Sequence, residues 1–165
     1  MFGLGASSSR KLSEKIVKQI IGFQSRMFRL SFEEFGIPQS AINRLEITYY
    51  STAIVALSIL YVSKHKSKME AVEQAQLDAL KTSLPNSGSS LSLAEAVSNY
   101  QEKFSQYKEI FDDLLRGKLR EPYIILATLF MNAVSDGKAS MPPYVTANLI
   151  FSKGISDNLD FAKNV

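Results

Sequence analysis

Apolar residues recur along this chain at helical spacing, and one stretch, residues 45–63, is apolar almost without interruption. It reads LEITYYSTAIVALSILYVS, has no charged residue between Glu46 and Lys64, and contains neither Gly nor Pro. Strands usually run for about 4–8 residues, so a stretch of this length favours a helix. We therefore predict a central helix over residues 39–64, buried by the rest of the chain.

The alternative for the same stretch is a membrane-spanning helix. Its uncharged part is about 17 residues long, at the lower limit for crossing a bilayer. It also carries many hydroxyl groups, which are costly to place in lipid without hydrogen-bond partners. These belong to Thr48, Tyr49, Tyr50, Ser51, Thr52, Ser58 and Tyr61. The sequence favours a buried core helix over a span.

Further helices are predicted on either side of the central one, because apolar residues recur every three or four positions. Ser67 with Glu70, and Ser92 with Glu95, have the spacing of a capping box that opens a helix. Gly36 and Gly154 are expected to end helices. The predicted helices span residues 9–35, 68–83, 92–116, 122–135, 144–152 and 156–162.

These segments predict an all-α fold: a single-domain helical bundle of about five to six helices around the buried central helix, residues 39–64. We expect residues 1–8 to be a flexible N-terminal segment, residues 9–162 to form the bundle, and residues 163–165 to fray. The Ser- and Gly-rich stretch 85–91 is composed like a linker. Dividing the chain there would leave two halves of about 80 residues with marginal cores, so a surface loop is predicted instead.

The helix after this loop carries a narrow apolar seam with alternating spacings of four and three. A strict 3.5-residue repeat predicts packing along a partner helix over the full length of the seam. Its aromatic content favours packing inside the domain, and a coiled coil with another molecule is the alternative. The helix-packing seam consists of Leu93, Val97, Tyr100, Phe104, Tyr107, Phe111 and Leu114.

The first predicted helix is basic on the side opposite its apolar residues. This face is the main candidate binding surface, and it consists of Lys11, Lys15, Lys18, Arg26 and Arg29. Such a face is typical of a solvated outer surface, and it also suits an anionic partner. The anionic partners considered are a membrane surface, an acidic protein or a nucleic acid.

Composition excludes several classes of chemistry. There is no cysteine, so disulfides, thiolate metal sites and cysteine nucleophiles are excluded. The single histidine, His65, cannot supply a multi-histidine metal site. The eight glycines are scattered and do not form a phosphate-binding loop. No cofactor, metal site or catalytic residue is predicted, and the residues form no motif that resembles a known family.

The sequence therefore predicts a non-catalytic helical module for protein–protein interaction or assembly, acting as an adaptor, a chaperone-like protein or a structural subunit. A protein partner or self-association is the expected mode of action. The alternative is a peripheral membrane or anionic-surface protein that docks through the basic first helix. The net charge of +3 and the lack of a recognition motif disfavour nucleic acid. No small-molecule substrate is inferred, and the expected location is cytoplasmic, with peripheral membrane association as the alternative.

Overall fold

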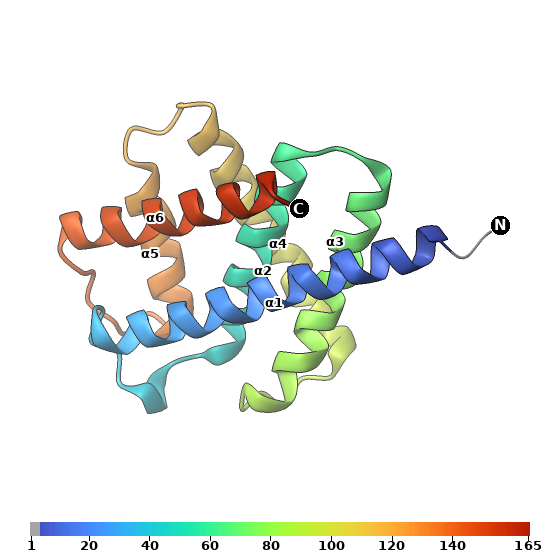
Figure 1. Cartoon of the computed structure of the whole chain (residues 1–165). Coiled ribbons are helices and arrows are strands. Elements are labelled where there is room, and N and C mark those ends of the chain that lie inside the picture. Colours follow the sequence, from blue (N-terminus) through green and yellow to red (C-terminus); the bar gives the residue numbers. More distant parts are fainter. Residues whose placement is uncertain (1–3) are drawn as a thin grey trace.

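The computed structural model describes the backbone of residues 4–165 and the side chains of residues 8–66 and 68–165. Within residues 4–165 all regular structure is helical, as the sequence predicts (Figure 1). The α-helices are α1 (Leu4–Glu33), α2 (Arg44–Val62), α3 (Lys66–Ser83), α4 (Leu93–Leu115), α5 (Pro122–Val134) and α6 (Tyr144–Lys163). Two short 3-10 turns, η1 (Gln39–Ala41) and η2 (Leu84–Asn86), complete the fold.

Helix α2 is the core of the bundle, which confirms the prediction of a buried central helix. It packs against α1, α3, α4, α5 and α6, and α1 crosses in front of it in Figure 1. Leu45 and every residue from 47 to 59 are buried. By length and composition α2 could cross a membrane, but 78% of its most apolar part lies inside the fold. The core helices of globular domains meet the same criteria.

The start of α2 differs from the predicted boundary at residue 39. The Asn43 side chain accepts hydrogen bonds from the backbone N–H groups of Leu45 and Glu46, so the helix begins at Arg44. An asparagine in this capping position satisfies donors that have no partner inside the helix. Residues 39–41 form the separate turn η1. At the other end, Ser63 is already extended, so the helix is shorter than predicted at both ends.

Aromatic rings from four other helices surround Tyr50 at the centre of α2. Its ring centroid lies 4.8 Å from Phe130, 5.4 Å from Tyr107, 5.8 Å from Phe151 and 5.9 Å from Phe23. Most of these pairs are edge-to-face, the arrangement that the ring quadrupole favours. This cluster joins α1, α4, α5 and α6 to the central helix.

The interior also contains hydroxyl groups that make no hydrogen bond to the described protein groups. They belong to Ser13, Tyr49, Tyr50, Ser51, Thr52 and Tyr107. Thr48 and Ser58 are satisfied, because they donate to backbone carbonyls one turn earlier in α2. Burial raises the pKa of Tyr49 to about 12, with the Glu46 carboxylate adding to the increase. Burial raises the pKa of Tyr50, Tyr100 and Tyr107 further above the ordinary value.

Helix α4 begins with the predicted capping box. The backbone N–H of Glu95 donates to Ser92 Oγ at 3.3 Å, and the N–H of Ser92 donates to Glu95 Oε2 at 2.8 Å. These two bonds satisfy the backbone N–H groups of the cap residue and of the third helical residue, which have no partner inside the helix. The helix ends at Leu115, Arg116 caps it, and Gly117 follows with a φ of 65°.

The seam of α4 packs inside the domain along α2. Tyr100, Tyr107 and Phe111 are buried, and the other four members are partly buried against the core. Tyr100 contacts Tyr49, and Phe111 contacts Tyr61, with ring centroids 6.0 and 6.5 Å apart. From the first contact to the second, the residue number rises in both helices, so α2 and α4 run in the same direction.

The predicted capping box at Ser67 is wrong. Helix α3 begins at Lys66, so Ser67 lies in the first turn and His65 occupies the cap position. The His65 side chain makes no capping hydrogen bond. Its backbone carbonyl instead accepts from the N–H groups of Lys68 and Met69 at 3.0 and 3.1 Å. The helix therefore starts two residues before the predicted position.

The prediction that Gly154 ends a helix is also wrong, because α6 continues through it to Lys163. Gly154 is buried, and a Cβ atom there would lie 3.3 Å from Cζ of Phe23. The glycine therefore permits close contact between α6 and the Phe23 ring rather than a change of chain direction. The two short helices that were predicted over 144–152 and 156–162 are one helix.

The ends of the chain are more helical than expected. Helix α1 begins at Leu4, so it includes most of the segment 1–8 that was predicted to be flexible, and residues 1–3 lie outside the described residues. At the other end, Lys15 Nζ donates to the carbonyl of Asn164 at 3.3 Å, and Lys68 Nζ donates to the carbonyl of Val165. Side chains from α1 and α3 thus contact the tail that was expected to fray.

Candidate interaction surfaces

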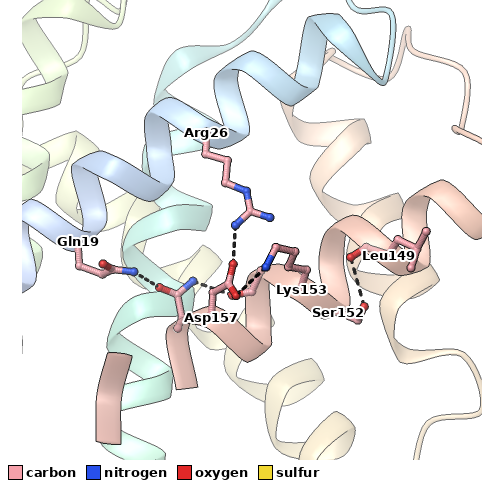
Figure 2. A network of polar contacts seen from close by, with 8 residues as sticks. Gln19, Arg26, Leu149, Ser152, Lys153 and Asp157 are labelled. Atoms are coloured by element: carbon pink, nitrogen blue, oxygen red, sulfur yellow. Dashed lines mark hydrogen bonds and ion pairs between the residues drawn. The ribbon is translucent and has the colours of Figure 1, made fainter. Parts of the chain in front are cut away.

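The basic face of α1 is partly engaged within the molecule. Arg26 points from α1 to α6, where its Nη1 lies 2.7 Å from Oδ2 of Asp157 (Figure 2). Lys153 also approaches Asp157, at 3.1 Å, so this carboxylate lies between two cations. In the same region Gln19 donates to Asn158 at 2.9 Å. The Arg26 guanidinium therefore joins two helices rather than projecting freely.

The pKa of Asp157 reflects this arrangement. Partial burial alone would raise it, but hydrogen bonds from Arg26 and Lys153, together with their positive charges, lower the pKa below the ordinary value. The carboxylate is therefore charged at neutral pH. The Arg26–Asp157 pair joins residues that are 131 positions apart in the sequence, so it helps to hold α6 beside α1.

The other cations of this face differ in their surroundings. Arg29 lies 3.5 Å from Glu33 on its own helix, and Lys15 contacts the end of α6. Lys11 and Lys18 are exposed and form no ion pair with any described residue. Only two of the five predicted binding residues thus present a charge without an intramolecular partner, which is a weak footprint for an anionic surface.

A different surface stands out on the first half of α6 and the connection just before it. Four large apolar side chains project into solvent there, which is unusual for residues of this size in a well-packed bundle. Their exposed fractions are 42% for Met141, 54% for Tyr144, 66% for Val145 and 64% for Leu149. We call these four residues the α6 strip. In Figure 1 the start of α6 lies at the end of the molecule remote from the start of α1.

Helical geometry explains why Val145 and Leu149 of the α6 strip are exposed. Val145 and Leu149 are one turn apart and share a face, whereas Ala147, Phe151 and Ile155 are buried against the core. Helix α6 is therefore apolar on more of its circumference than the core can cover. The chain also has no charged residue between Lys138 and Lys153. Exposed apolar residues without neighbouring charges are typical of the centre of a protein–protein interface.

A second exposed apolar group lies where α2 joins α3. Tyr61, Val62 and Met69 are 57%, 39% and 42% exposed. Exposed Lys64 and Lys66 lie between them in the chain. We call these five residues the α2–α3 corner. It differs from the α6 strip because its apolar side chains are interspersed with positive charge.

The described residues place no catalytic group in an evident arrangement. Within them, no three His, Asp or Glu side chains lie close enough together to hold a metal ion. His65 is exposed at the start of α3. Glu46 is half-buried and pairs with Lys103 at 3.3 Å, which ties α4 to α2.

Comparison with known proteins gave no match to a protein-family model, a curated protein or a solved structure.

Sequence reasoning missed the α6 strip, because it predicted a helix over residues 144–152 without asking which of its apolar residues the core could cover. The available signal was the excess of apolar residues: Val145 and Leu149 lie outside the arc that contains Ala147 and Phe151. The uncharged run on either side of them was a second signal.

Proposed function

We propose that this protein is a non-catalytic interaction module that binds a protein partner through the α6 strip. The observation that carries the proposal is the exposure of Met141, Tyr144, Val145 and Leu149 within a stretch that has no charge. Burying these side chains against a partner would remove apolar area from water, the main favourable contribution to most protein association. The partner surface should itself be apolar and uncharged at its centre, as on one face of an amphipathic helix.

The size of the strip suggests a transient contact. Four partly exposed side chains make a patch of a few hundred Å², whereas a stable interface buries about 800 Å² on each partner. The strip would therefore be the apolar centre of a contact whose rim comes from neighbouring polar residues. Asn148 and Ser152, which are partly exposed polar residues close to Leu149 in α6, are suited to such a rim.

Site-specific photo-crosslinking in the native cell tests this proposal. A photoreactive amino acid at position 149 should give a discrete protein adduct, whereas the same residue at position 98, exposed on α4, should not. Replacing Val145 with Ser in the position-149 protein should reduce the yield of the adduct. An adduct of twice the chain mass would identify a second copy as the partner. Equal labelling from both positions, or no adduct at 149, would overturn the proposal.

A second candidate function is docking on an anionic membrane surface, and the α2–α3 corner supports it better than the basic face of α1. Apolar and aromatic side chains beside lysines are the combination that interfacial binding uses. Vesicles containing phosphatidylserine should then sediment the protein, and binding should weaken with salt. Replacing Lys64 and Lys66 with Gln should reduce sedimentation more than replacing Lys11 and Lys18. The opposite order would favour α1, and no sedimentation would refute both.

A further inference from the structure

A cavity between α1, α2 and the end of α3 has the features of a ligand site. Its volume is about 300 Å³, the lower end of the range for small-molecule pockets. It is lined by Ile21, Gln24, Ser25, Phe28, Arg44, Ile47, Thr82, Ser83 and Asn86. Ile21, Phe28 and Ile47 provide apolar walls, and Arg44 is the single charged side chain in the lining. The five remaining lining residues are polar and uncharged, so the cavity combines an apolar part with groups that can form hydrogen bonds to a ligand.

Arg44 is positioned to receive an anion. Its guanidinium carbon lies 4.3 Å from the centroid of the Phe28 ring, so the ring supports the planar group from one side. The N–H groups at the edge of the guanidinium are left free by this contact. Arg44 also forms no ion pair with any carboxylate in the described part of the chain. A planar guanidinium with free edges matches a carboxylate, which it can bind through two parallel hydrogen bonds.

The polar groups beside Arg44 are held in place before any ligand enters. The Gln24 amide donates to Thr48 Oγ1 at 2.9 Å and accepts from Ser83 Oγ at 3.1 Å, so both of its ends are fixed. Three helices are linked through this one side chain. A wall that is already ordered loses little conformational freedom when a ligand binds. By contrast, the Asn86 side chain at the rim makes no hydrogen bond to a described group and is free to contact a ligand.

We propose that this cavity binds a small organic monocarboxylate, with the carboxylate on Arg44 and the apolar part against Ile21, Phe28 and Ile47. One cation and apolar walls suit a single negative charge better than a phosphate, which carries more charge and more acceptor oxygens. This site lies on other helices than the α6 strip and does not depend on the proposed partner. It adds a small-molecule ligand to the proposed function.

Benzoate, hexanoate and cyclohexanecarboxylate are suitable probes, titrated into the ¹⁵N-labelled full chain and followed by NMR. At least one should give saturable shifts of backbone amides that line the cavity, with a dissociation constant in the millimolar range that is usual for fragments of this size. The matching uncharged amide of that acid should bind at least 10-fold more weakly. Because the amide comparison uses the wild-type protein, it is independent of any variant's folding.

Two variants complete the test. Arg44→Gln should weaken binding at least 10-fold, whereas Arg29→Gln, at an exposed arginine outside the cavity, should leave it unchanged. Binding by none of the three acids, equal binding of acid and amide, or equal binding by Arg44→Gln and the wild type would each overturn the proposal. A shift of the α6 amides alone would place the ligand elsewhere and would also overturn it.

Discussion

Replacing two buried tyrosines with phenylalanine should have different effects on stability, although the chemical change is the same. Tyr50 and Tyr100 are both at least 95% buried. The hydroxyl of Tyr100 accepts a hydrogen bond from Gln76 Nε2 at 2.9 Å, whereas the hydroxyl of Tyr50 has no partner among the described groups. The pair therefore compares a satisfied with an unsatisfied buried hydroxyl in one core.

The expected magnitudes follow from these contacts. Tyr100→Phe loses one hydrogen bond and should lower the free energy of unfolding by about 0.5–1.5 kcal/mol. Tyr50→Phe keeps the ring contacts with Phe130 and Tyr107 and removes a hydroxyl whose unpaired burial costs about 1–3 kcal/mol. It should therefore be neutral or stabilising. The two variants should therefore differ by at least about 0.5 kcal/mol in the free energy of unfolding, and each 1 kcal/mol corresponds to about 2–4 °C in Tm for a chain of this size.

Urea unfolding followed by circular dichroism measures this difference. Both variants should unfold in one transition with the wild-type m-value, because neither changes the surface exposed on unfolding. If Tyr50→Phe lowers the free energy of unfolding by as much as Tyr100→Phe, the Tyr50 hydroxyl has a hydrogen-bond partner. The description of the core around α2 would then be wrong at its centre.

Three further outcomes are expected. Alkaline pH should unfold the protein, because the tyrosines whose folded pKa is raised stay protonated while those of the unfolded chain ionise above about pH 10. Each of these tyrosines should lower the free energy of unfolding by about 1.4 kcal/mol by pH 11, and a flat stability between pH 9 and 11 would contradict this. Leu57→Ala should lower the free energy of unfolding by about 2–5 kcal/mol in the same urea assay, and Leu57→Asp should prevent folding, because this side chain is only 4% exposed. Gly154→Leu should reduce Tm by forcing Phe23 away, whereas Gly22→Leu, on the open side of α1, should not. Equal Tm values for the two variants would show that α6 does not need a glycine at position 154.

The sequence predicts the main features of the fold because they depend on local signals. The uncharged run of α2 and the Ser92–Glu95 capping box need no knowledge of the rest of the chain. Gly154 was misinterpreted for the opposite reason. Its role depends on Phe23, which is 131 positions away in the sequence, and no pattern around residue 154 contains that information.

The candidate surfaces were harder to predict. A cation such as Arg26 has the same helical position whether it meets solvent or Asp157, so its pairing becomes visible only in the folded chain. The same holds for Val145 and Leu149, whose exposure depends on how far the other helices extend over α6. Arg44 and Phe28 lie on different helices, and their stacking follows from the packing of α1 on α2.

Hydrogen–deuterium exchange of the full chain in detergent-free buffer tests the central claim, that α2 is the buried core helix, most directly. Exchange of a buried helix requires opening of the whole fold, whereas exposed helix ends open locally at little cost. The backbone amides of residues 49–59 should therefore be the slowest in the chain, and those of residues 144–150 should exchange much sooner. If the amides of 49–59 exchange as fast as those of 144–150, or are protected only after detergent is added, α2 is not the core of this protein.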